Sequence, residues 1–231
     1  MDAFRVAAQV VKTRFPEAVA AVLAGSVARG TATDTSDLDI VVVLAGPPAP
    51  FRETLRANGW VVELFVNTPD SLEYWYGQDG LERRNSLADM VVQGIPLFES
   101  SELFEIKAKA AAIIASGPTP LSETERDDRR YALTDVLEDL MGTHDPDERD
   151  AIAGQALVLS AELALLVDRR WLGRGKWLIR RLREADPDLA HQLSAAHREV
   201  VSSGSHTDLV KVMEDVLARA GGPLTEGYLR Q

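Results

Sequence analysis

The hydrophobic pattern of the chain changes near residue 100, and this change constrains the fold more than any other feature of the sequence. Before it, short apolar runs alternate with segments of helical periodicity; the runs cover residues 18–25, 39–44 and 60–66. Runs of this length that are rich in β-branched residues predict buried strands. From Ser101 onward the periodicity is helical and no convincing strand follows. The sequence therefore predicts an α+β fold, in which a mixed sheet with flanking helices precedes an all-α helical bundle.

Proline and glycine place the boundary between these two parts. The sequence Ser-Gly-Pro-Thr-Pro at residues 116–120 is the best linker in the chain. We therefore expect one domain over residues 1–115 and a helical bundle over residues 116–231. Helices are expected in the first domain at the start of the chain, over residues 51–58, from Pro69 and from about Leu81. In the second, the capping-box pattern of Ser122 and Glu125 starts a helix that runs to about residue 141, and further helices are expected near 147–170, 175–185, 187–202 and 206–219.

Composition narrows the class of partner. The chain has 231 residues and no cysteine, which excludes disulfides and thiolate metal sites. Its net charge is −11 and its pI is about 4.9, whereas surfaces that bind long nucleic acids are usually basic. We expect no long DNA or RNA substrate. The longest apolar stretch, residues 151–167, contains polar residues and is too short to span a bilayer. We expect a soluble, cytoplasmic protein.

The segment that carries chemistry runs from residue 23 to residue 43. A predicted strand ends at Gly25-Ser26, and Asp37-Leu38-Asp39 enters the next one. Residues two apart in a strand project from the same face, so both carboxylates point to one side. Such a pair repels unless a cation lies between its members, and magnesium prefers oxygen ligands of this kind. Gly25 allows the backbone to approach a phosphate closely, and the Ser26 hydroxyl can donate to that phosphate.

A third acid lies on the following strand. Glu63 is surrounded by apolar residues in the run from residue 60 to residue 66, which is a costly place for an unpaired carboxylate. Two divalent ions that activate an attacking hydroxyl and stabilise a leaving group generally call for a third carboxylate on a neighbouring strand. We therefore predict that Asp37, Asp39 and Glu63 are the catalytic and metal-binding residues.

This arrangement resembles the polymerase-beta-like nucleotidyltransferase superfamily. The shared pattern is Gly-Ser, a spacer, Asp-x-Asp and a later strand acid, and it covers roughly residues 18–68. The resemblance implies that ATP or another nucleoside triphosphate is the co-substrate, that Gly25 and Ser26 hold its triphosphate and that Asp37 and Asp39 bind magnesium. Many members have Asp where this chain has Glu63, which leaves open whether Glu63 is a ligand or a general base.

Each of these residues also has an ordinary structural interpretation. The two aspartates could form a turn or a solvated strand start, because loop residues precede them. Arg29 could cap a short helix or reach a phosphate. Glu63 without the other elements would be an edge-strand surface residue.

The whole architecture resembles antibiotic nucleotidyltransferases, among them the adenylyltransferases that act on aminoglycosides, in which a helical bundle closes over the acceptor. Residues 121–150 hold eleven acidic residues against four basic ones. Tyr131, Asp135 and Asp139 share one face of the predicted helix, and we predict that they bind a cationic acceptor. The alternative is a solvated outer face. Glu162 could also be a substrate carboxylate or an edge residue of the bundle.

A basic stretch with two tryptophans follows, over residues 169–183. In proteins of this resemblance, basic residues of the bundle often complete the triphosphate site, which makes Lys176 a predicted nucleotide ligand and Arg174 a weaker one. The alternative is a basic helix terminus that matches the helix dipole.

Three functions follow from these patterns. The first is transfer of a nucleoside monophosphate, AMP from ATP, to a hydroxyl of a small molecule such as an aminoglycoside, which would make the protein an antibiotic-resistance enzyme. The second is an antitoxin-like adenylyltransferase that modifies a partner protein; such antitoxins are typically a lone catalytic domain, whereas this chain carries its own bundle. The third is a nucleotide-binding regulator, which the complete carboxylate set disfavours.

Overall fold

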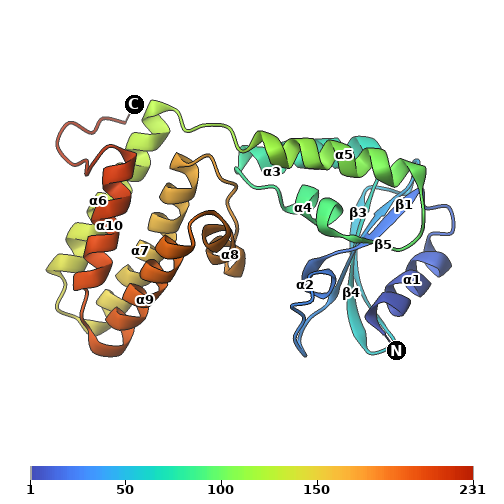
Figure 1. Cartoon of the computed structure of the whole chain (residues 1–231), viewed down its shortest axis with the longest axis horizontal. Coiled ribbons are helices and arrows are strands. Elements are labelled where there is room, and N and C mark those ends of the chain that lie inside the picture. Colours follow the sequence, from blue (N-terminus) through green and yellow to red (C-terminus); the bar gives the residue numbers. More distant parts are fainter. Residues whose placement is uncertain (1, 231) are drawn as a thin grey trace. The chain divides into compact units, whose positions relative to one another are not determined.

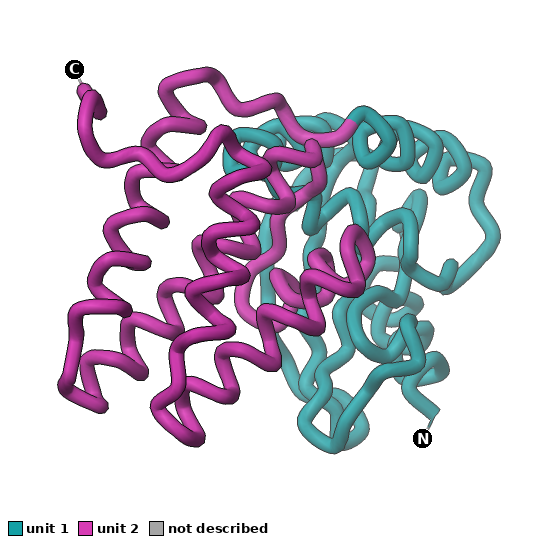
Figure 2. The backbone as a smooth tube through the Cα atoms, turned by 60° about the vertical axis from the view of Figure 1, so that its left-hand side comes forward, with its two compact units in different colours: residues 1–116 teal, residues 117–231 magenta. Residues whose placement is uncertain are grey.

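The chain folds into two compact units. The computed structural model describes residues 2–230, and the division falls between Ser116 and Gly117 (Figure 2). The first unit contains every strand of the described chain, and the second is built from helices. The predicted α+β class, a mixed sheet followed by a helical bundle, is confirmed.

A five-stranded mixed sheet organises the first unit. Its strands are β1 (Ala20–Leu23), β2 (Leu38–Val43), β3 (Phe51–Ala57), β4 (Trp60–Asn67) and β5 (Ile95–Pro96). Their spatial order is β3-β4-β2-β1-β5. The central pair, β2 and β4, is parallel, and the other pairs are antiparallel. The carboxyl end of β1 therefore lies beside the amino end of β2.

Helices cover both faces of this sheet (Figure 1). On one face α1 (Ala3–Arg14) packs against alternate residues of β2 and β4, including Leu38, Ile40 and Leu64. On the other face lie α3 (Pro69–Leu81), α4 (Ser86–Gln93) and α5 (Ser101–Ser116), packed against Val41 and Val43. A further short helix, α2 (Gly25–Ala28), follows β1 directly. The sheet thus has two buried faces, as its near-continuous apolar strands predict.

Residues 51–58 do not form the predicted helix. They form the edge strand β3 and its turn to β4, with Ala57 paired to Trp60. Asn58 and Gly59 both have positive φ, 47° and 87°, and an Asn-Gly pair of this kind is the usual two-residue turn of a β-hairpin. Burial alternates along β3 as in a strand with one covered face. Gly59 therefore belongs to a hairpin turn and does not end a helix.

The second unit consists of α6 (Glu123–Gly142), α7 (Pro146–Val167), α8 (Lys176–Ala185), α9 (Pro187–Ser203) and α10 (Thr207–Ala220). The predicted capping box at the start of α6 is present: Ser122 accepts a hydrogen bond from the Glu125 backbone N–H, and the Glu125 side chain accepts one from the Ser122 N–H. Asp145 caps α7 in a similar way, through the N–H groups of Asp147 and Glu148.

The longest helix of this unit, α7, is also its most apolar. By length and hydropathy α7 would be long and apolar enough to cross a membrane. Its buried residues, among them Leu163, Leu165 and Leu166, belong to the core that also contains Leu133 and Leu193 of neighbouring helices. The composition of α7 is that of the central helix of a bundle, which is buried on several sides.

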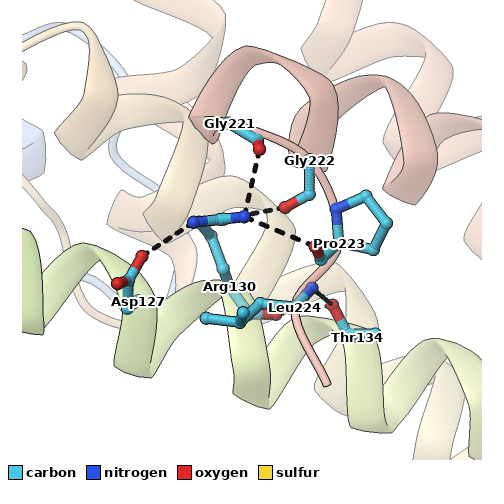
Figure 3. A network of polar contacts seen from close by, with 7 residues as sticks. All are labelled: Asp127, Arg130, Thr134, Gly221, Gly222, Pro223 and Leu224. Carbon is cyan, nitrogen blue, oxygen red and sulfur yellow. Dashed lines mark hydrogen bonds and ion pairs between the residues drawn. The ribbon is translucent and has the colours of Figure 1, made fainter. Parts of the chain in front are cut away.

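The segment after α10 returns to α6, where Arg130 holds it (Figure 3). The Arg130 guanidinium donates to the backbone oxygens of Gly221, Gly222 and Pro223 at 2.8–3.4 Å and pairs with Asp127 at 2.7 Å. One turn along α6, the hydroxyl of Thr134 accepts a hydrogen bond of 3.1 Å from the Leu224 N–H. Backbone groups of an irregular segment are thereby satisfied without secondary structure.

Replacing Arg130 should free this segment. In Arg130→Ala the three carbonyls lose their charged donor, and we expect the free energy of unfolding of the second unit to fall by about 1–3 kcal/mol. Hydrogen exchange should show the Leu224 amide losing its protection. Arg126→Ala, at an exposed position of the same helix, is the control. Unchanged protection at Leu224 in the Arg130 variant would contradict this account.

Candidate active site

The register of the two parallel strands brings acidic side chains together on one face of the sheet. Asp39 of β2 lies directly opposite Glu63 of β4. Their neighbours Leu38, Ile40 and Leu64 are completely buried under α1. Because side chains alternate along a strand, Asp39 and Glu63 both project from the opposite face.

Asp37, one residue before β2, joins this pair. One carboxylate oxygen from each of Asp37, Asp39 and Glu63 lies within 4.8 Å of the others, and all three residues are half-buried. Oxygens bound to one octahedral Mg²⁺ are about 3–4 Å apart. The donor set, all hard carboxylate oxygens at nearly this spacing, therefore fits a magnesium ion. Without a cation three such groups would repel one another.

Gly25 touches this acidic group. Its φ is +69°, and a Cβ atom built on it would overlap the carboxylate of Asp39. The preceding N–H, of Ala24, donates to the Asp39 backbone oxygen at 2.7 Å. These contacts place the start of α2 directly beside the three carboxylates. Only glycine combines this backbone conformation with so close an approach.

Ser26 holds the loop that separates the Gly-Ser motif from the Asp-x-Asp motif. Its hydroxyl donates to the Ser36 hydroxyl at 3.0 Å, and the Thr31 N–H donates to its carbonyl at 2.9 Å. Ser36 immediately precedes Asp37. Ser26 thus lies beside the acidic group, as expected, and its role as a phosphate ligand stays a prediction.

Arg29, the predicted nucleotide ligand at the end of α2, pairs with Asp89 of α4. The Asp89 side chain is nearly buried and the Arg29 side chain is about one-quarter exposed. This ion pair ties the end of the Gly-Ser segment to the helix layer. Binding of Arg29 to a phosphate stays a prediction.

Arg52 of β3 is a functional candidate that the sequence analysis missed. Its guanidinium pairs with the Glu63 carboxylate at 3.0 Å and lies 4.2 Å from the centroid of the Phe65 ring. Arg52 is directly opposite Phe65 in the ladder. The Asn-Gly turn is the signal that could have placed it here, because the turn fixes the register of β3 on β4.

The predicted acceptor face of α6 is only partly open. The ring of Tyr131 stacks on Tyr228 with centroids 4.2 Å apart, and the Tyr228 hydroxyl donates to Asp128 at 2.6 Å. That hydrogen bond to a carboxylate raises the pKa of Tyr228. Asp135 and Asp139 are exposed. The segment after α10 therefore covers one end of this face, and an acceptor-binding role for the three predicted residues stays a prediction.

Lys176 is the first residue of α8 and is exposed, as is Arg174 just before the helix. The positive end of the helix dipole lies at its N-terminus, where a cation is unfavourable. A match to the helix dipole therefore does not explain Lys176. Glu162 pairs with Arg129 at 3.3 Å inside the second unit, which agrees with a structural role for this carboxylate.

The comparison with protein families agrees with this geometry. A family model described as a nucleotidyltransferase domain matches residues 5–92. These residues belong to that family. The matched range contains Gly25, Ser26 and the three acidic residues, so the chain is a nucleotidyltransferase enzyme.

Two solved structures are similar to this chain. A nucleotidyltransferase-like protein from Exiguobacterium sibiricum 255-15 is 16% identical with a TM-score of 0.46; the alignment covers 95% of this chain and 77% of that one. The spectinomycin adenyltransferase AAD(9) from Enterococcus faecialis, solved with ATP and spectinomycin, is 12% identical with a TM-score of 0.37; the alignment covers 95% and 98%. No curated protein matches this chain in sequence.

The close approach of Gly25 to Asp39 gives a paired test within the nucleotidyltransferase domain. Gly25→Ala adds a methyl group that displaces the Asp39 carboxylate, so we expect nucleotidyl transfer to be lost and Mg²⁺ affinity, measured by calorimetry, to fall.

Gly30→Ala is its control. Gly30 also has a positive φ, +66°, but a Cβ there meets no atom within 4 Å. Both variants carry the backbone cost of about 1–2 kcal/mol for a left-handed alanine. Equal loss of Mg²⁺ affinity in the two variants would show that backbone strain, and not contact with Asp39, is responsible.

Proposed function

We propose that the chain transfers a nucleoside monophosphate, AMP from ATP, to a hydroxyl of a small molecule in a reaction that requires Mg²⁺. The observation that carries this proposal is the convergence of Asp37, Asp39 and Glu63 beside the glycine that opens α2. We place the reaction in the cytoplasm, where ATP and Mg²⁺ are abundant.

Each residue of the site has a role in this reaction. The N-terminal end of α2 and the Ser26 hydroxyl hold the triphosphate, because free backbone N–H groups favour negative charge. Asp37 and Asp39 would hold the magnesium ions, and Glu63 beside them is left to act as the base. The chemistry that bound Mg²⁺ supplies is a lower pKa for the attacking hydroxyl and charge stabilisation on the leaving pyrophosphate. Lys176 and Arg29 are proposed as further phosphate ligands.

Glu63 acts as the general base. It accepts the proton of the acceptor hydroxyl while the hydroxyl oxygen forms a bond to the α-phosphorus. The bond from the α-phosphorus to the bridging oxygen of the β-phosphate breaks, and pyrophosphate leaves with that oxygen. The ion pair with Arg52 orients the Glu63 carboxylate.

The acidic face of α6 supports a cationic acceptor, such as an aminoglycoside-type antibiotic. Asp135 and Asp139 are exposed. Tyr131 stacks on Tyr228, whose hydroxyl donates a hydrogen bond to Asp128. A negatively charged surface raises the local concentration of a cation. Resistance of a sensitive host that expresses the protein would then follow from modification of the antibiotic.

The proposed reaction can be measured directly. Protein incubated with Mg²⁺, ATP labelled at the α-phosphate and a panel of aminoglycosides that includes spectinomycin should release pyrophosphate and label the small molecule. Removal of Mg²⁺ by a chelator should stop both. Label on a protein that co-purifies, with none on any small molecule, would instead identify a protein-modifying adenylyltransferase. Labelled ATP that binds without any transfer would contradict both.

Asp39→Ala should abolish this transfer and leave the fold intact. Loss of a metal ligand removes several kcal/mol of transition-state stabilisation, so the rate should fall at least ~100-fold. The unfolding midpoint should hold or rise, because the variant relieves repulsion between carboxylates. Asp34→Ala, at an exposed position of the preceding loop, is the matched control. Turnover by the Asp39 variant at the wild-type rate would contradict the proposed metal-dependent mechanism.

A further inference from the structure

A hollow lies on the sheet face that carries the acids, within the first unit. It is a groove of about 360 Å³ between the β3–β4 hairpin on one side and α3 and α4 on the other. The reaction described above does not use this groove.

The groove begins beside the proposed base. Phe65, which lines it, follows Glu63 by two residues on the same face of β4, a separation of about 7 Å along a strand. Arg52 also lines the groove and joins the two, since its guanidinium pairs with Glu63 and covers the Phe65 ring. A molecule in the groove would therefore have one end at the Glu63 carboxylate.

The order of the strands places the groove on the far side of Glu63 from the proposed triphosphate site. The Gly25 segment follows β1, and β2 with Asp39 is the neighbour of β1. Next to β2 lies β4 with Glu63, and β3, which lines the groove, lies beyond β4. An in-line displacement needs the attacking hydroxyl and the leaving pyrophosphate on opposite sides of the α-phosphorus. This position suits the acceptor, and not the triphosphate.

The chemistry of the walls is mainly apolar. Phe65, Trp75, Leu87 and Met90 contribute to them, and the Trp75 side chain is 46% exposed. The one carboxylate of the lining, on Asp79, already accepts a hydrogen bond of 3.0 Å from the Leu87 N–H. The charge of Arg52 is paired with Glu63. Such a surface gains free energy from covering apolar atoms and offers little to a molecule that carries only ammonium groups.

We propose that this groove binds an apolar portion of the acceptor, which therefore carries apolar atoms in addition to the hydroxyl and cationic groups proposed above. The proposal rests on the proposed function, because it assigns the groove to the acceptor of that reaction. It extends acceptor recognition to the catalytic domain and makes Trp75 a specificity-determining residue.

The experiment uses alkyl β-D-glucosides as probes, which share their hydroxyl groups and differ in apolar length. Calorimetry would measure dissociation constants of the methyl, butyl and hexyl compounds, below micellar concentrations, with a non-hydrolysable ATP analogue and Mg²⁺ present or absent. We expect affinity to rise about fourfold for each methylene that becomes buried, and the analogue to leave this series unchanged. Trp75→Ala should abolish the dependence on chain length.

The control is Phe104→Ala, which removes another exposed aromatic side chain from the same unit, on α5, and should retain the dependence. Equal affinity for the three glucosides would overturn the proposal. Displacement of hexyl glucoside by the ATP analogue would also overturn it, because the groove would then belong to the nucleotide. These results are separate from the transfer assay: glucoside binding without any nucleotidyl transfer would refute the proposed function alone, and transfer without chain-length dependence would refute the groove alone.

Discussion

The parallel pairing of β2 with β4 is the constraint on which the rest of the site depends. It sets Asp39 opposite Glu63 and, through the alternation of side chains, directs both away from the core beneath α1. A shift of one residue in this register would place an acid among the apolar residues of that core, at a cost of several kcal/mol. Burial of Leu38, Ile40 and Leu64 therefore fixes the position of the acids.

The same constraint explains how much the sequence could predict. The apolar runs and the Gly-Ser and Asp-x-Asp spacing are local signals, so strands β1, β2 and β4, the bundle helices and the convergence of Asp37 with Asp39 follow from them. The helix predicted over residues 51–58 was wrong, because the Asn58-Gly59 turn folds this segment back on β4 as a strand. For the same reason Arg52 was not predicted as a site residue, because its contacts with Glu63 and Phe65 exist only when β3 pairs with β4.

Contacts between distant segments could not be predicted from the sequence, for a different reason. Arg29 with Asp89, and Tyr131 with Tyr228, are joined by tertiary packing over 60 and 97 residues of chain. No periodicity or spacing connects such residues. The covering of Tyr131 by Tyr228 changes the expected acceptor face, because one of its three residues already has an aromatic partner inside the unit.

One sheet face serves two purposes because its character changes along each strand. On this face Asp39 stands near the start of β2 and Glu63 near the middle of β4, and Val41 and Phe65 follow them. Charged groups need water or a cation, whereas the apolar positions need cover. Helices α3 to α5 cover most of the apolar part, and the groove at Phe65 is where that cover is incomplete. An apolar hollow next to a carboxylate suits neither a purely charged ligand nor a purely apolar one. It suits a ligand that brings a hydroxyl to Glu63 and apolar atoms to the groove.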